Sequence, residues 1–306
     1  MTAVETSSLL MKRATYAAVA VAGLLIAAKI VAWLLTGSVS VLSSLLDSLL
    51  DIAASLLNLI AVRHAVTPAD REHRFGHGKA EPLAGLGQSA FIAGSAAFLF
   101  IEALHRALSP EPIENSTVGI VIMLLSIVIT IGLVTYQRHV VALTGSLAIG
   151  SDELHYRSDI VLNGSVILSL LLSSLFGWSF LDPIFGAAIG VWIVYSAWQV
   201  ASRSLTQLMD REIPDDERAR IRAIALAHGE VSAVHDLRTR AAGPTAFVQL
   251  HIEMDGAMTL AHSHVVADEV EARILEAFPN AEVIIHQDPA GVAEVRRTFP
   301  PTRQPA

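Results

Sequence analysis

Long apolar segments separated by short polar connections fill the first two thirds of the chain. Each is long enough to cross a bilayer as a helix, which takes about 20 residues. Only a few residues around Thr36 and Gly37 separate the first two segments, so those helices should be antiparallel neighbours. The pattern predicts six membrane-spanning helices, near residues 13–36, 40–62, 82–107, 116–137, 145–176 and 179–203.

The pattern changes after about residue 209 to that of a soluble domain. A helix should begin at Pro214, with acidic residues in its first turn, and end by Gly229. Alternating residues on both sides of Gly243-Pro244 predict a β-hairpin. A second amphipathic helix and a last strand follow, which completes an αββαβ order. The predicted strands are 233–241, 245–254 and 283–288, and the second helix is 262–277.

The same alternation predicts which side chains of this domain form its core. In the second strand, Val248, Leu250, Ile252 and Met254 should face inward. The inward side chains expected in the second helix are Val265, Val266, Val270, Ile274 and Leu275.

The predicted fold class is therefore an α-helical polytopic membrane protein with six transmembrane helices, followed by a small α+β cytoplasmic domain. We divide the chain into a transport domain over 1–209, with a polar loop at 64–81, and an αββαβ domain over 210–292. The remaining tail, 293–306, is expected to be disordered.

Composition supports a membrane protein and narrows its chemistry. Only 16% of the residues are charged, against about 25% in soluble domains, and 53% are hydrophobic. The chain has no cysteine, so disulfides and thiolate metal sites are excluded and any metal must be held by His, Asp or Glu. A net charge of −8 without a basic cluster argues against nucleic acid as a partner.

Lysine and arginine residues predict the orientation of the chain in the membrane. They precede the first helix and follow the second, fourth and sixth, whereas the opposite side has Arg106 and nothing comparable. Both termini should therefore be cytoplasmic. The N-terminus lacks the short apolar core and small-residue cleavage site of a signal peptide, so its first helix should be retained.

Asp47 and Asp51 lie four residues apart inside the second apolar segment, which places them on one helix face. A carboxylate at the centre of a membrane helix costs roughly 2.5–3.5 kcal/mol on insertion scales. Two carboxylates on one face would also repel each other unless a cation joined them. This spacing therefore indicates a cation site.

His155 and Asp159 repeat the four-residue step in the fifth segment, and both pairs fall near the bilayer midplane. Three carboxylates and one imidazole suit tetrahedral coordination of a divalent transition metal, zinc in particular. The alternative is that each pair caps a helix or forms salt bridges elsewhere. Lys29 is the nearest intramembrane cation for such a bridge, and Arg157 should point to a different face.

Two further groups of polar residues are candidate metal ligands. Asp70, His73 and His77 in the polar loop could surround one ion, or the loop could be a polar connector with two solvated histidines. In the C-terminal domain, several histidines lie on or beside the sheet, one of them on the same strand face as an aspartate. They indicate a second metal site, with candidate ligands His235, His251, His264, His286 and Asp288.

These motifs, taken in order, resemble those of the cation diffusion facilitator family, in particular its bacterial zinc and ferrous-iron efflux subgroup. The resemblance runs from the first helix to Asp288. It rests on Asp47-x3-Asp51, His155-x3-Asp159, the loop sequence Phe75-Gly-His77-Gly-Lys79-Ala-Glu81, and Ile285-His286-Gln-Asp288-Pro289.

The resemblance implies a homodimer in the bacterial inner membrane that exchanges cytoplasmic divalent metal for external protons by alternating access. Zinc is the implied cargo, with cadmium and ferrous iron as further candidates, and the C-terminal domain is implied to be metallochaperone-like and metal-sensing. Three metal sites are implied: a transport site (Asp47, Asp51, His155, Asp159), a loop site (Asp70, His73, His77) and a cytoplasmic site (His235, His251, His264, His286, Asp288). Lys79 and Asp210 match a charge pair between the two domains.

Three alternatives remain open at this stage. A membrane metalloenzyme would need an open metal position with a nearby base, as in His-Glu-x-x-His, and no such motif occurs, so we expect no enzyme. A membrane-anchored metal sensor would not need six spans with ionisable groups at the midplane. A metal channel without proton coupling would need weaker ligands than these.

Overall fold

The computed structural model describes residues 3–36, 39–108, 117–176 and 181–292. The chain divides into two compact units, Met1–Leu208 and Met209–Ala306. The predicted disordered tail, 293–306, lies outside the described residues.

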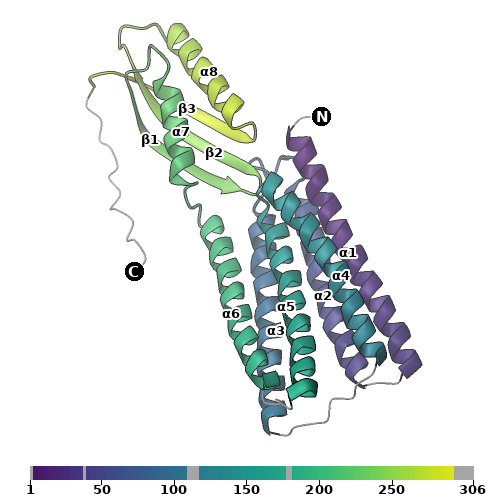
Figure 1. Cartoon of the computed structure of the whole chain (residues 1–306). Helices are drawn as coiled ribbons and strands as arrows, with labels where there is room; N and C mark the ends of the chain where they lie inside the picture. The colour runs from purple at the N-terminus through teal and green to yellow at the C-terminus, as the bar shows by residue number, and fades with distance from the viewer. Residues whose placement is uncertain (1–2, 37–38, 109–116, 177–180, 293–306) are drawn as a thin grey trace. The chain divides into compact units, whose positions relative to one another are not determined.

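The first unit is a bundle of long helices at the six predicted positions (Figure 1). Helix α1 packs on α2 and α4, α3 packs on α6, and α5 contacts α3, α4 and α6. The predicted helices are confirmed, and several run further than predicted. Their bounds are α1 Ala3–Thr36, α2 Val39–Ala65, α3 Ala80–Leu108, α4 Thr117–Thr144, α5 Leu147–Phe176 and α6 Leu181–Leu208.

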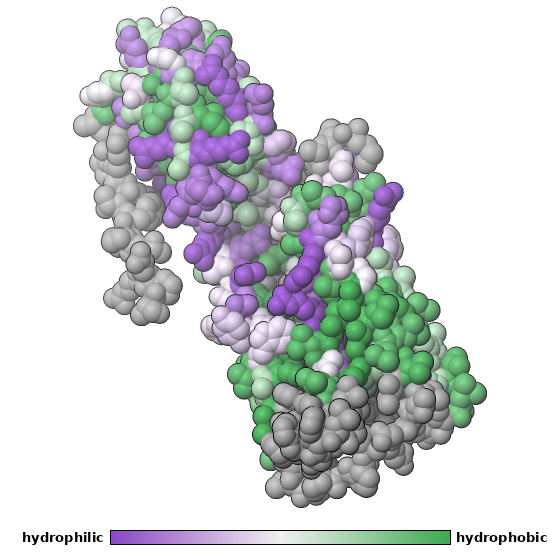
Figure 2. All heavy atoms as spheres, in the orientation of Figure 1, coloured by the Kyte–Doolittle hydropathy of each residue, from purple (hydrophilic) through white to green (hydrophobic). Residues whose placement is uncertain are grey.

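Large apolar side chains cover the outside of the bundle, as Figure 2 shows in green, whereas small ones fill the helix contacts. Leu34, Ile60 and Val128 are exposed, while Ala14, Ala18 and Ala54 are completely buried. This inside-out distribution suits a hydrocarbon solvent, in which small residues let helices approach closely. Three described stretches have the length and hydropathy to cross a membrane by themselves: Glu5–Leu35, Ser48–Ala65 and Met123–Thr144.

The second unit is a three-stranded sheet with two helices, in the predicted αββαβ order. The sheet order is β1-β2-β3, with β1 antiparallel and β3 parallel to the central strand β2. Gly243 adopts φ +58° in the turn between β1 and β2, a conformation that glycine tolerates best. The element bounds are α7 Asp215–Leu226, β1 Ala233–Ala242, β2 Thr245–Met254, α8 Leu260–Ala277 and β3 Ala281–Pro289.

The core of this unit follows the predicted alternation with one correction. The four β2 side chains expected inside are at most 3% exposed. In α8, Val266, Val270 and Ile274 are buried, but Val265 is exposed, so its prediction was wrong. The buried positions recur every four residues, and Val265 lies about 100° around the helix from Val266.

A β-bulge interrupts the first strand beside the candidate metal ligands. The register passes from His235↔His251 to Arg238↔Gln249, and Asp236 takes φ +46° inside the bulge. Val234 and Thr239 therefore both face the core although they are five positions apart in the sequence. The bulge follows the His235–His251 pair, so His235 and Thr239 lie on opposite faces, whereas an unbroken strand would place them on one face.

Candidate metal sites

Asp51 of α2 and His155 and Asp159 of α5 come together inside the helical bundle. One ligand atom of each lies within 4.8 Å of the others. His155 Nε2 is 3.1 Å from Asp51 Oδ1 and 3.9 Å from Asp159 Oδ2. The structure thus brings together two segments that are 104 residues apart in the sequence.

The fourth predicted ligand of this transport cluster, Asp47, lies on α2 one turn before Asp51. Its side chain is outside the described residues.

A buried hydrogen bond holds the two helices of the transport cluster together. The hydroxyls of Ser55 on α2 and Tyr156 on α5 are 2.7 Å apart, and both side chains are almost fully buried. Ser55 lies one turn after Asp51, and Tyr156 directly follows His155. This bond therefore fixes the level at which the carboxylate and the imidazole meet.

Asp152, three residues before His155, is a buried carboxylate that sequence reasoning missed. The side-chain amides of Gln137 on α4 and Gln88 on α3 donate to its two oxygens, at 2.7 and 3.4 Å. These bonds tie α5 to both neighbours one turn from His155. The signal in the sequence was a glutamine or aspartate in each of three apolar segments, since polar groups in membrane helices hydrogen-bond across helices.

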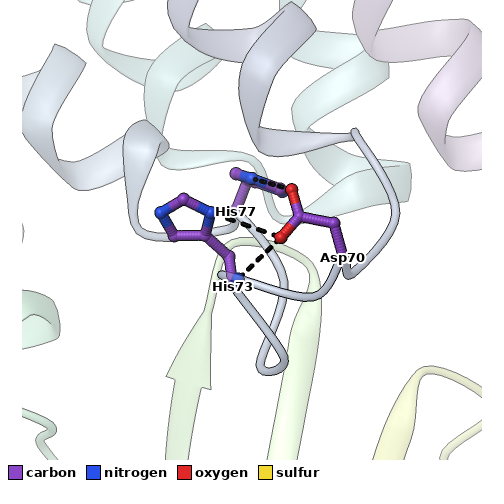
Figure 3. Close-up of side chains that lie close together, drawn as sticks. All are labelled: Asp70, His73 and His77. Atoms are coloured by element: carbon purple, nitrogen blue, oxygen red, sulfur yellow. Dashed lines mark hydrogen bonds and ion pairs between the residues drawn. The ribbon is translucent and has the colours of Figure 1, made fainter.

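Asp70, His73 and His77 form a second cluster in the connection between α2 and α3 (Figure 3). Asp70 Oδ1 is 3.4 Å from His73 Nδ1, and Asp70 Oδ2 is 3.4 Å from His77 Nε2. His77 is buried, whereas the other two side chains are about half exposed. Both histidines thus approach the same carboxylate, that of Asp70.

Backbone hydrogen bonds in this loop stabilise the charged form of the Asp70 carboxylate. The backbone N–H groups of His73 and Glu72 donate to Asp70 Oδ1 at 2.6 and 2.9 Å. These bonds, the one from His73 foremost, lower the pKa of Asp70 below its ordinary value. The carboxylate is therefore charged at neutral pH, which is the form that binds a cation.

A third cluster lies on one face of the sheet in the second unit. Asp288 Oδ2 is 2.8 Å from His251 Nδ1 and 3.5 Å from His235 Nε2, while Asp288 Oδ1 is 3.1 Å from His286 Nε2. The register pairs His235 with His251 and His251 with His286, so the three rings form a row across the strands. Three imidazoles therefore converge on a single buried carboxylate.

We call the group of His235, His251, His286 and Asp288 the cytoplasmic cluster. Two further residues, His264 and Glu253, were compared with it. His264 was predicted as a ligand, but within one chain it does not join the cluster. It lies on α8, where its exposed ring is 3.5 Å from Asp268 Oδ1. Glu253, which sequence reasoning did not select, places Oε1 3.3 Å from His235 Nε2. Its position two residues after His251 on the same strand face was the signal for it.

The predicted charge pair joins residues of different units. Within their own units, Lys79 Nζ donates to the carbonyl of Leu208 at 3.4 Å, and Asp210 is 3.4 Å from an Arg240 nitrogen. The link between Lys79 and Asp210 stays a prediction.

Comparisons with known proteins agree over almost the whole chain. Residues 15–209 match the family model described as the cation efflux transmembrane domain, and residues 213–290 match that of the cation efflux protein cytoplasmic domain. The cation-efflux pump FieF of Klebsiella pneumoniae is 50% identical over 283 residues, which cover 92% of this chain and 94% of that protein. The FieF pump of Escherichia fergusonii gives the same identity and coverage.

Among solved structures, the metal-bound C-terminal domain of the CzcD transporter from Thermotoga maritima is 29% identical. It matches with a TM-score of 0.25 and covers 26% of this chain and 93% of that one.

Proposed function

This chain belongs to the cation efflux, or cation diffusion facilitator, family of membrane transporters, and from that premise we propose that it exports zinc in exchange for protons. Cadmium and ferrous iron are the further cargoes that its ligands suit. The observation that carries the proposal is the convergence of Asp51, His155 and Asp159 from two helices inside the bundle.

The ligand set supports zinc. The cluster offers one nitrogen and two carboxylate ligands, and Asp47 on the same face of α2 would supply a third carboxylate. A tetrahedral set of His and Asp ligands without thiolate suits zinc and related divalent metals. Magnesium would instead require nearly ideal octahedral oxygen ligation.

Proton exchange follows from the contact between His155 and Asp51. A metal requires a neutral imidazole with a free nitrogen lone pair, so the metal and a proton compete for His155 Nε2. In the metal-free cluster, a proton on that nitrogen can be donated to Asp51 Oδ1 across the observed 3.1 Å. A protonated site would return across the membrane with less uncompensated negative charge.

Alternating access is supported by the origin of the ligands on α2 and α5. Rigid-body rocking of helices around a site near the midplane opens it to one side at a time. We further propose that both termini face the cytoplasm of the bacterial inner membrane and that two copies assemble as a homodimer. The row of His235, His251 and His286 around Asp288 supports a metal-sensing role for the cytoplasmic domain.

Zinc uptake into proteoliposomes, with and without a pH gradient, tests the function. We expect gradient-driven flux in the unmodified chain and its loss in Asp51→Ala, because a ligand of the transport cluster is missing. Asp216→Ala is the matched control, since Asp216 is an exposed aspartate of α7 outside all three clusters. Flux that ignores the gradient would instead indicate a channel, and metal binding without flux would indicate an anchored sensor.

A further inference from the structure

The loop cluster brings three protein ligands together, whereas a closed structural zinc site has four. Asp70, His73 and His77 contribute one carboxylate and two imidazoles. A fourth ligand would have to reach the same ion as His77, the buried member of the cluster.

His64, in the last turn of α2, has its ring beside that of His77. Its ring centroid is 4.6 Å from that of His77, at an interplanar angle of 68°. The ring of His73 lies at the same centroid distance from His77, 4.6 Å. His64 is thus as close to the central ring as a residue already selected as a ligand.

This separation is close to the one that a shared zinc ion requires. A zinc–nitrogen bond of about 2.0–2.1 Å puts the metal about 3.2 Å from each ring centroid. Two such rings at a tetrahedral angle have centroids about 5 Å apart. The separation of the two rings therefore matches one shared metal. The ligand atoms that lie within 4.8 Å of one another are those of Asp70, His73 and His77, so the His64 ring would have to rotate to join them.

The backbone at the end of α2 orients His77 for this purpose. His77 Nδ1 lies 3.4 Å from the carbonyl oxygen of Thr67, and the Thr67 N–H donates to the carbonyl of His64 at 3.0 Å. An Nδ1–H donated to that carbonyl leaves the Nε2 lone pair, which faces Asp70, for a metal. Thr67 therefore connects the turn that carries His64 with the ring that His64 approaches.

We propose that His64 is the fourth ligand of the loop site and completes a closed zinc site of three imidazoles and one carboxylate. This ligand set is richer in nitrogen than the transport cluster, so it favours zinc over oxygen-preferring cations. The bound metal would join the end of α2 to the connection before α3. The inference rests on the proposed function only in that the loop cluster binds a divalent metal.

The test measures metal binding by the full-length chain in detergent. A background chain with Asp51→Ala, His251→Ala and Asp288→Ala disables the other two clusters. Cobalt(II) is the probe, because its visible absorption is intense in four-coordinate tetrahedral sites and weak in six-coordinate ones. Zinc affinity is then measured by displacement of cobalt.

His64→Phe in this background keeps an aromatic ring beside His77 but cannot bind metal. We expect it to weaken zinc binding at least about tenfold and to reduce the tetrahedral band, as water replaces the fourth ligand. His139→Phe, at an exposed histidine of α4, is the matched control and should change neither readout. Circular dichroism checks that both variants keep their helices.

Equal affinity and equal absorption in His64→Phe and the background chain would overturn the proposal. It would also be overturned if the background chain bound no cobalt, because the loop would then hold no site to complete. Neither result touches the transport function, which is measured separately by flux through the unmodified chain and Asp51→Ala. If the unmodified chain showed no flux, the proposed function would fail, but the cobalt measurement of the loop site would still be valid.

Discussion

Replacing Ile252 with alanine separates the stability of the cytoplasmic domain from the chemistry of its metal ligands. Ile252 lies in the central strand β2, is completely buried, and packs in the core between the sheet and the two helices. Its neighbours His251 and Glu253 point to the opposite face of the sheet, where they contact Asp288 and His235. The substitution therefore removes core volume but no candidate ligand.

The expected loss follows from the side chain that is removed. The change deletes about three buried methyl or methylene groups, each worth about 0.8 kcal/mol of transfer free energy, or about 2.4 kcal/mol together. The cavity left behind adds to this, so the free energy of unfolding should fall by about 2–5 kcal/mol. Each 1.4 kcal/mol is a factor of ten in an equilibrium constant. The opening equilibrium should thus rise between about 30-fold and a few thousand-fold.

Hydrogen exchange of the β2 amides, measured by mass spectrometry on the full-length protein, reports this opening. Fluorescence would not, because all four tryptophans belong to the first unit. Ile284→Ala on β3 is the matched control, since that isoleucine is 54% exposed and should contribute little. Exchange in Ile252→Ala as slow as in the unmodified chain would refute this account of the core.

Zinc should partly restore the stability of the cytoplasmic domain in Ile252→Ala, because a ligand that binds only the folded domain stabilises it. At a free zinc concentration about 100 times the dissociation constant, the gain is about 2.7 kcal/mol, or about 100-fold slower exchange. Absence of zinc protection in both the variant and the unmodified chain would show that the cytoplasmic cluster does not bind the metal.

Two further predictions concern single side chains. Tyr156→Phe should lower the melting temperature in detergent, because it leaves the buried hydroxyl of Ser55 without its hydrogen-bond partner, at a cost of about 1–3 kcal/mol. Tyr195→Phe, at an exposed tyrosine of α6, is the control and should have little effect. His235→Ala should weaken the activation of transport by cytoplasmic zinc while flux through the transport site persists. An unchanged dependence of liposome flux on zinc concentration would contradict the sensing role.

Local periodicity was sufficient to predict the six helices, the αββαβ order and the inward side chains of β2. Each depends on repeats of 3.6 or 2 residues within one segment, which packing partners do not alter. The proximity of His155 and Asp159 belongs to the same class, because a four-residue step defines one helix face wherever the helix lies. The pairing of Asp47 with Asp51 stays a prediction.

Other features depended on how segments far apart in the sequence meet. Periodicity could not show that Asp51 and His155 face each other at one level, which the bond between Ser55 and Tyr156 sets. Nor could it place the bulge after His235, the exposure of Val265, or the ring of His64 beside His77. Spacing along the chain defines the face on which a side chain lies, but only packing between elements decides what that face meets.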